Sequence, residues 1–167
     1  MKSNAKGNVY RAIDLRHQKN ISLKVIKEGR QYCLDDRYGR DIRTRLRHQE
    51  SVHNSLVGSI PIPKADPYFE YDGNGYLPLE YISGKSIEEK SEELWNELCF
   101  DEKVKRIRYL IQLVDIVSTV HNKRIIHRDL SASNIWITDT DKVYLLDLEL
   151  AHRMNGNEHP FESHTPG

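Results

Sequence analysis

Residues 126–134 read Ile-His-Arg-Asp-Leu-Ser-Ala-Ser-Asn, and residues 147–149 read Asp-Leu-Glu. Between them, two short apolar runs at 135–138 and 143–146 flank a polar turn and predict a β-hairpin. A loop that leaves a helix and enters a tight hairpin can bring Asp129, Asn134 and Asp147 to one cleft. By itself, His-Arg-Asp is equally compatible with an ordinary ion-pair cluster. The ordered set of helix, loop, asparagine, hairpin and aspartate indicates a chemical site.

A long helix is predicted just before this loop, from residue 101 to residue 122. Asp101 is its predicted N-cap. Apolar residues recur along it at three- and four-residue steps, which predicts one buried face. They are Val104, Ile107, Leu110, Ile111, Val114, Val117 and Val120.

The first half of the chain is predicted to be rich in β-structure. Residues 8–15 and 21–27 alternate apolar and polar side chains and predict two strands joined by residues 16–20. Residues 68–71 and 76–82 flank an Asp-Gly turn and predict a hairpin. Pro78 lacks an amide donor, so its strand is expected at an edge or with a bulge.

Residues 41–57 predict a helix between these two pairs of strands. Arg40, Arg43 and Arg47 form a basic stripe along it. This stripe is either a solvated helix face or a site for a phosphorylated or acidic segment.

The segment 127–134 resembles the catalytic loop H-R-D-L-x-x-x-N of protein kinases, and Asp147 stands where that family has the D-F-G aspartate. The resemblance implies an α+β, protein-kinase-like bilobal fold. Its N-lobe, an antiparallel sheet plus one helix, would span 1–82, and a partial helical C-lobe would span 83–167. Asp129 would accept the proton of a substrate hydroxyl, with Arg128 beside it in the catalytic motif. Asn134 and Asp147 would hold Mg²⁺ against the phosphates of ATP.

Gly7 and Val9 look like the end of the family's glycine-rich loop, G-x-G-x-x-G-x-V. The two earlier glycine positions fall on Lys2 and Asn4. Taken alone, Gly7 fits an ordinary turn equally well. Residues 79–84 resemble the hinge between the lobes, with Leu79 as gatekeeper. Adenine would then be read by the Glu80 carbonyl and the Ile82 amide.

Lys24 and Lys27 compete for the role of the lysine that steadies the ATP phosphates. They are three residues apart, so on a strand they point to opposite faces. The usual strand spacing favours Lys24, whereas the narrower resemblance given below favours Lys27, which we prefer. Glu50 is the predicted partner of that lysine, although Gln49 occupies the inward position of the apolar helical frame.

At two positions the sequence departs from the motifs of typical protein kinases, and these departures indicate a narrower group within the family. Ser131 stands where typical serine/threonine kinases have lysine, and Glu149 stands where D-F-G has glycine. With residues 27–30, 39–46 and 165–167, these features resemble the kinase-like domain of class III and class IV lanthipeptide synthetases. Such domains phosphorylate Ser and Thr of a precursor peptide with ATP and Mg²⁺. A separate lyase domain then eliminates phosphate, and a cyclase-like domain adds cysteine. Those domains, or the rest of the C-lobe in a longer chain, are the implied partners.

Composition excludes several other classes. The 25 basic and 25 acidic residues balance, which argues against a nucleic-acid binder. No apolar run is long enough for a membrane span, and the N-terminus has no signal-peptide pattern, so we expect a cytoplasmic protein. Cys33 and Cys99 are expected as free thiols. His152, His159 and His164 are spaced too irregularly for a metal site.

Two other functions stay open. The missing glycines at positions 2 and 4 also fit a nucleotide-binding or inert pseudokinase that serves as an interaction module. A small-molecule kinase of the aminoglycoside type tolerates Ser131, although Thr-Pro-Gly at 165–167 argues against it. We expect the chain to begin inside its glycine loop and to stop inside its activation segment. It should therefore expose apolar surface on the 101–122 helix and show weak activity, or none, by itself.

Overall fold

The computed structural model describes residues 2–4, 7–16, 21–33, 35–90, 100–156 and 158–162. The connection 17–20, Cys99, His164 and the tripeptide 165–167 lie outside the described residues. The chain forms two compact units. The first comprises residues 1–55, 63–81 and 159–167, and the second comprises residues 56–62 and 82–158. None of the helices in the described part of the chain has the length and apolar content of a membrane span.

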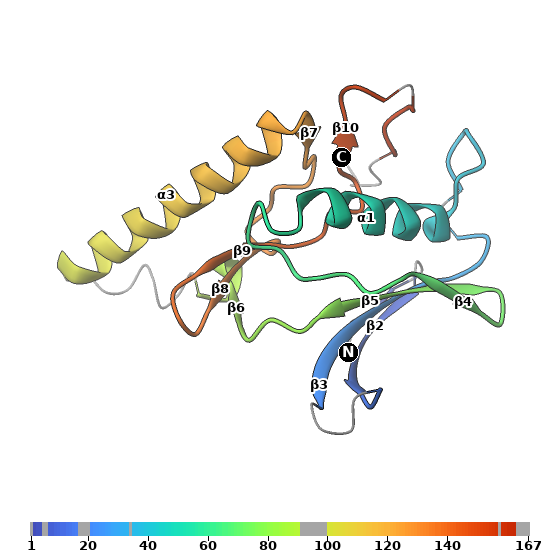
Figure 1. Ribbon diagram of the computed structural model, residues 1–167, viewed down its shortest axis with the longest axis horizontal. Coiled ribbons are helices and arrows are strands. Elements are labelled where there is room, and N and C mark those ends of the chain that lie inside the picture. Colours follow the sequence, from blue (N-terminus) through green and yellow to red (C-terminus); the bar gives the residue numbers. More distant parts are fainter. Residues whose placement is uncertain are drawn as a thin grey trace. The chain divides into compact units, whose positions relative to one another are not determined.

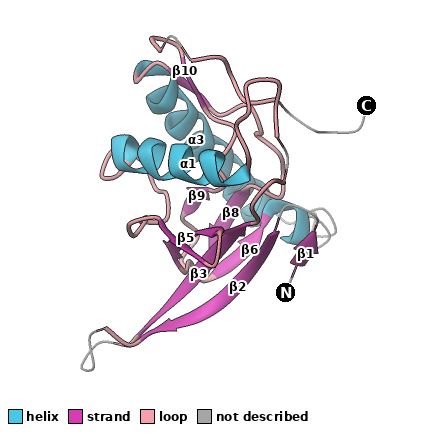
Figure 2. Ribbon diagram, turned by 90° about the vertical axis from the view of Figure 1, so that its right-hand side faces the viewer, coloured by secondary structure: helices cyan, strands magenta, loops and turns pink. Residues whose placement is uncertain are grey.

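The first unit is built on a five-stranded antiparallel sheet (Figure 2). The strand order is β1 (Lys2–Asn4), β2 (Gly7–Asp14), β3 (Ser22–Gly29), β5 (Asn74–Glu80) and β4 (Phe69–Tyr71). These strands confirm the two pairs predicted from alternating apolar residues. The β4–β5 turn is as tight as expected, because Asp72 and Gly73 both adopt positive φ angles of 48° and 76°.

Pro78 does not lie on an edge strand, because β5 pairs with β3 on one side and with β4 on the other. Strand β4 pairs only with residues 74–76, so Pro78 lies beyond its end. The Pro78 carbonyl accepts a hydrogen bond of 2.9 Å from the Asp66 amide. In an antiparallel strand the nitrogen and carbonyl of one residue point the same way. The ring nitrogen therefore faces the 64–66 segment, where no ladder donor is required.

Helix α1 (Ile42–Leu56) lies against one face of this sheet (Figure 1). Asp41 begins it as N-cap, because its Oδ1 accepts a 3.0 Å bond from the Thr44 amide. Leu46 packs in a buried cluster with Leu77 and Leu79. Gly29 lets the helix approach the sheet, since a Cβ there would stand 3.0 Å from Leu46 Cδ1. The helix predicted at 41–57 is thus confirmed.

The second unit contains helix α3 (Phe100–Asn122) and two small sheets. Strands β6 (Gly84–Ser86), β8 (Ile135–Thr138) and β9 (Val143–Leu145) form one, and β7 (Ile125–Ile126) pairs with β10 (His152–Arg153) in the other. The predicted hairpin at 135–146 is confirmed as β8–β9. Its core positions Ile137 and Val143 are fully buried.

Helix α3 buries only part of the predicted face. It begins at Phe100, so Asp101 lies inside its first turn and the predicted N-cap is wrong. Its buried residues are Tyr109, Ile116 and Val120. Four apolar residues of the predicted face are more than half exposed: Ile107, Leu110, Ile111 and Val114. The apolar surface expected on this helix is therefore present.

Candidate active site

The catalytic loop is anchored by the buried side chain of His127. Its Nε2 lies 2.9 Å from the Leu146 carbonyl, which can only accept, so Nε2 carries the proton. Its Nδ1 accepts a 3.2 Å bond from the Asp129 amide. A neutral imidazole satisfies both contacts at once. His127 therefore fixes the backbone of Asp129 to the strand that leads into the Asp-Leu-Glu segment.

Asn134 holds the Asp129 carboxylate from the other end of the loop. Asn134 Nδ2 lies 3.0 Å from Asp129 Oδ2 and 3.0 Å from the Asp129 carbonyl. The Ser131 amide also donates to that carbonyl, at 3.0 Å. The loop from 129 to 134 is thus closed on itself, and its aspartate is half-buried rather than free on the surface.

The β8–β9 register sets Asn134 opposite Leu146, the residue before Asp147. Ile135 pairs with Leu145, and the Leu146 amide donates to the Asn134 carbonyl at 2.8 Å. Asp147 follows directly and turns the chain with φ 54°. Its Oδ1 accepts from the Glu149 amide at 3.4 Å, and Leu148 anchors the turn with a fully buried side chain. The expected meeting of Asp129, Asn134 and Asp147 in one cleft stays a prediction.

The oxygen donors in this part of the second unit suit a hard divalent cation such as Mg²⁺. Because the Asn134 NH₂ group is turned toward Asp129, the amide oxygen Oδ1 points away from that carboxylate. Asn134 Oδ1 and a carboxylate oxygen of Asp147 are then the two groups that would hold the metal. Their assignment as ligands stays a prediction.

Arg128 adopts a left-handed backbone conformation with φ 66°. Its guanidinium is exposed and donates to the Leu150 carbonyl at 3.4 Å. A positive φ is uncommon for a residue with a long side chain and costs on the order of 1 kcal/mol or more. The strain lies immediately before Asp129, at the position where the loop must present that carboxylate.

In the first unit, Lys27 points toward helix α1. Its Nζ lies 3.2 Å from Gln49 Oε1. Val9 is the direct cross-strand neighbour of Lys27, so the two side chains lie on the same face of the sheet. Val25, two residues earlier on that face, packs against the core cluster under the helix.

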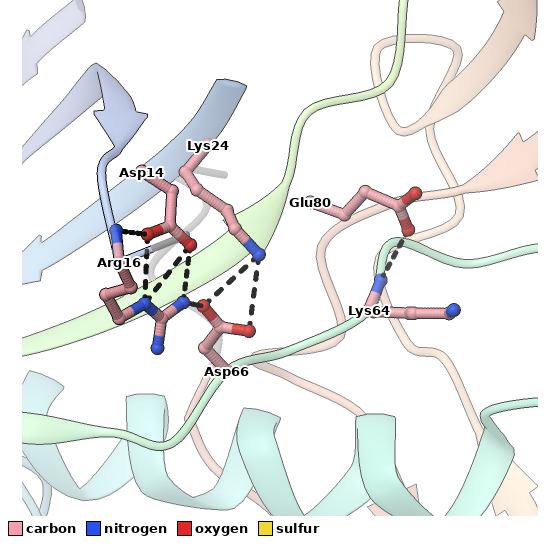
Figure 3. Close-up of polar contacts among 6 residues, drawn as sticks. All are labelled: Asp14, Arg16, Lys24, Lys64, Asp66 and Glu80. Atoms are coloured by element: carbon pink, nitrogen blue, oxygen red, sulfur yellow. Dashed lines mark hydrogen bonds and ion pairs between the residues drawn. The ribbon is translucent and has the colours of Figure 1, made fainter. Parts of the chain in front are cut away.

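Lys24 lies on the opposite face and belongs to a different cluster, shown in Figure 3. Its Nζ is 3.2 Å from Asp66. Arg16 bonds to both Asp14 and Asp66, and its hydrogen bonds hold the pKa of Asp14 well below its ordinary value. The opposite orientation of the two lysines agrees with their spacing of three. Lys24 therefore belongs to an ion-pair network with Asp66 and Arg16.

Glu50 accepts a hydrogen bond from the backbone just ahead of strand β4. Its Oε1 accepts a 3.2 Å bond from the Tyr68 amide, and the helix residue beside Lys27 is Gln49. The predicted pairing between Glu50 and the lysine stays a prediction. Leu46, Gln49 and His53 form the buried stripe of α1, and the residue after Gln49 is rotated about 100° away from it.

Gly7 lies where strand β2 crosses the end of β3. Its φ is 150°, and a Cβ would stand 2.0 Å from the Glu28 carbonyl. Glycine is required here by backbone packing, which is the plainer of the two readings of this residue. Its role beside a nucleotide, like that of Val9, stays a prediction.

The predicted hinge residues end strand β5. Leu79 is buried in the core cluster. The Glu80 amide donates to the Lys64 carbonyl at 2.8 Å, and its Oε2 accepts from the Lys64 amide at 3.2 Å (Figure 3). Ile82 begins the stretch 82–158 of the second unit. The change of unit between Tyr81 and Ile82 is what a hinge requires, while adenine binding by Glu80 and Ile82 stays a prediction.

The basic stripe binds groups of its own chain. Arg43 bonds to Asp41 and Arg47 to Glu70. Arg40 donates to the carbonyls of His159 at 2.6 Å and Pro160 at 3.2 Å.

In the described part of the chain, no group of three or more His, Cys, Asp or Glu side chains could hold a metal ion.

The sequence reasoning missed Phe161, which is buried against α1. Its ring lies 4.2 Å from the guanidinium carbon of Arg40 and 5.1 Å from the ring of His48. Periodicity could not predict this contact, because Phe161 lies in an irregular segment. The available signal was an isolated aromatic residue in a chain that also has a basic stripe, since arginine side chains pack on aromatic rings.

The sequence of this chain is similar to those of known proteins. The family described as protein kinase domain matches residues 4–165. A probable serine/threonine-protein kinase of Clostridium acetobutylicum is 26% identical over 148 residues, which cover 88% of this chain and 21% of that protein. Serine/threonine-protein kinase B of Synechocystis is 31% identical over 125 residues, which cover 74% of this chain and 21% of that protein. A probable SapB synthase of Streptomyces coelicolor is 28% identical over 157 residues, which cover 89% of this chain and 17% of that protein.

The chain spans about a fifth of the length of these curated relatives. The family match confirms the predicted fold class and the predicted class of domain, a kinase-like phosphotransferase. Since the match runs through both units, the chain belongs to the protein kinase domain family.

Proposed function

We propose that this chain carries the ATP-binding and catalytic-loop residues of a serine/threonine protein kinase. The hydroxyl oxygen of a Ser or Thr side chain attacks the γ-phosphorus of ATP. The bond to the bridging oxygen breaks, ADP leaves, and the hydroxyl proton passes to the Asp129 carboxylate. The observation that carries the proposal is the Asp129–Asn134 contact of 3.0 Å, in the loop that leads into strand β8.

Each remaining residue has a role in this proposal. Lys27 steadies the phosphates, because its ammonium group is held on the α1 face of the sheet and Lys24 is engaged with Asp66. Asn134 keeps the Asp129 carboxylate oriented, and His127 keeps its backbone in place. Mg²⁺, when bound by Asn134 and Asp147, neutralises phosphate charge.

The test is phosphoryl transfer to a Ser/Thr-containing peptide, followed by mass spectrometry. Asp129→Asn should abolish transfer and leave ATP binding, measured by thermal shift with Mg²⁺, largely intact. Asp115→Asn is the matched control, because Asp115 is exposed on helix α3. Unchanged turnover in the Asp129 variant would overturn the proposal.

We further propose that the substrate is a lanthipeptide precursor and that the reaction is the first step of its dehydration. Ser131 and Glu149, at the two positions where typical kinases have Lys and Gly, support this substrate. A relative named as a probable synthase supports it too. Lyase and cyclase domains would then act on the phosphopeptide. Incubating the chain with ATP and a candidate precursor should add 80 Da per modified Ser or Thr, a mass that follows from adding HPO₃.

The second candidate is nucleotide binding without transfer, as in a pseudokinase. The neutral Gln49 beside Lys27 favours it, as do the non-glycine residues at positions 2 and 4. A thermal shift with ATP, and no phosphopeptide under the same conditions, would support this candidate over the first. No shift with ATP, with or without Mg²⁺, would leave an inert scaffold.

A further inference from the structure

A chain of three hydrogen bonds leads from Lys27 into the interior of the first unit. Lys27 Nζ lies 3.2 Å from Gln49 Oε1, and Gln49 Nε2 lies 3.4 Å from His53 Nε2. His53 Nδ1 lies 2.9 Å from the Pro63 carbonyl. Gln49 is 0% exposed and His53 is 1% exposed. The chain thus runs from a half-buried ammonium group to a fixed backbone oxygen, away from solvent.

The donors and acceptors of this chain allow one arrangement of protons. The Pro63 carbonyl only accepts, so His53 Nδ1 must carry a hydrogen. In the neutral imidazole, Nε2 is then an acceptor, and it receives a hydrogen bond from the Gln49 NH₂ group. With its NH₂ group turned to His53, Gln49 presents its oxygen to Lys27. Every contact is satisfied, and no group but the lysine is charged.

The opposite orientation of the Gln49 amide is unfavourable at both ends. Its NH₂ group would meet the Lys27 ammonium, placing donor against donor. Its oxygen would meet His53 Nε2, which would then need a second proton and would place an imidazolium in the buried interior. An unmet donor or an added buried charge costs free energy in such a site.

We propose that His53 is a positioning residue that orients the Gln49 amide so that its oxygen holds Lys27 in place for ATP. The inference rests on the proposed function, because Lys27 is taken as the phosphate-binding lysine. A neutral amide has only one oxygen and can face the wrong way, so it needs an orienting partner. A carboxylate would not need one, since both of its ends accept. Gln49 and His53 are four residues apart on α1, the spacing that places them on the same face.

The first experiment reads the His53 tautomer directly. In ¹⁵N-labelled full-length chain, long-range ¹⁵N–¹H correlation spectra distinguish a protonated Nδ1 from a protonated Nε2. The His53 signal is assigned by its loss in His53→Phe. We expect the Nδ1–H form with Nε2 unprotonated at neutral pH. An Nε2–H form would overturn the proposal, because Gln49 could not then donate to His53.

The second experiment is a double-mutant cycle on ATP affinity. His53→Phe removes the acceptor and should raise the Kd of ATP about tenfold in the Gln49 chain, the loss of one hydrogen bond to a charged group. In the Gln49→Glu background the same change should leave the Kd within about twofold, since either carboxylate oxygen serves Lys27. Thermal stability should fall by a similar amount in both backgrounds, because the Pro63 carbonyl loses its donor in each.

The outcomes separate this inference from the proposed function. If Lys27→Met leaves the Kd of ATP unchanged, the assignment of Lys27 fails and the proposed function fails with it. If Lys27→Met weakens binding but His53→Phe has equal effects in both backgrounds, His53 only packs and this inference alone is overturned. Should His53→Phe not fold, the tautomer at His53 still decides the question, with the signal assigned through Gln49→Glu.

Discussion

Asn134 Nδ2 lies 3.0 Å from both the carboxylate oxygen Oδ2 and the backbone carbonyl of Asp129, so one amide group holds the side chain and the main chain of the same residue. A carboxylate that accepts a substrate proton must face one direction throughout the reaction. The asparagine provides that restraint from within the loop. The amide oxygen of Asn134 then points away from that carboxylate.

Replacing Asn134 should therefore cost more than the loss of a metal ligand. Asn134→Ala should lower the rate of peptide phosphorylation about 100-fold or more, because it removes an oxygen donor and frees Asp129. Initial rates at saturating ATP measure this. Ser133→Ala, one residue earlier and exposed, is the control and should keep its rate. A fast Asn134→Ala enzyme would show that Asp129 needs no partner.

The two lysines of β3 should separate cleanly in binding experiments. Lys27→Met should raise the Kd of ATP tenfold or more, an effect of about 1.4 kcal/mol, since an ammonium group beside the phosphates is lost. Lys24→Met should leave the Kd within about twofold, because Lys24 bonds to Asp66 on the other face of the sheet. Isothermal titration with ATP and Mg²⁺ checks both. The reverse order would assign the role to Lys24.

Asp41 should make stability depend on acid pH. Burial raises the pKa of Asp41, but hydrogen bonds from Arg43 and Thr44 outweigh burial and hold it below the ordinary 3.8. A carboxyl whose folded pKa is lowered stabilises the fold above pH 3.8, and this contribution is lost as pH falls through the folded pKa.

Urea unfolding of Asp41 variants measures that contribution. Asp41→Ala should cost about 1 kcal/mol at pH 7, through the lost cap. Asp41→Asn can keep the cap but not the charge, so its deficit at pH 7 should shrink toward pH 3. A deficit that stays constant from pH 7 to pH 3 would mean that the ionised form contributes nothing.

Gly7 and Gly39 form a matched pair for the backbone of the first unit. Both have positive φ, 150° and 68°. Gly39 has no atom within 4 Å of a built Cβ, whereas Gly7 would place one 2.0 Å from the Glu28 carbonyl. Gly39→Ala should cost about 1 kcal/mol and Gly7→Ala more than 2 kcal/mol, because only the latter forces two strands apart. Equal costs in thermal unfolding would contradict this packing.

The two sides of helix α3 should respond oppositely to substitution. Ile116→Ala opens a buried position and should destabilise the chain by about 2–4 kcal/mol. Leu110→Gln changes a residue that is 58% exposed, so it should cost within about 0.5 kcal/mol and reduce binding of a hydrophobic dye. Strong destabilisation by Leu110→Gln would show that its face is covered in solution.

The local features of this fold could be read from the sequence because each is set by short-range rules. The β8–β9 hairpin follows from two apolar runs around a turn, and its register sets Asn134 opposite Leu146. The loop motif identified the candidate residues. The sheet of the first unit was predictable for the same reason.

Helical periodicity located α1 and α3 but did not decide every side chain that packs. On a helix, one position is a rotation of about 100°, and the apolar frame of α1 correctly placed Gln49 in the inward position. On α3 the periodicity was real, but most of the face that it marked is exposed. Val120 of that face is buried, together with Tyr109 and Ile116 from outside it. The stripe that packs is decided by tertiary partners, which periodicity does not contain.

Phe161 packs in the first unit although it comes from the C-terminal part of the chain. Its side chain lies over the fully buried Arg45, with the guanidinium carbon 5.5 Å from the ring, although 116 positions separate the two residues. A fragment that ends at Tyr81 would contain every strand of the five-stranded sheet but would lack the Phe161 side chain that covers Arg45. The N-terminal unit is therefore not an excisable module, and splitting or transplanting it requires carrying residues 159–162 along as a separate piece.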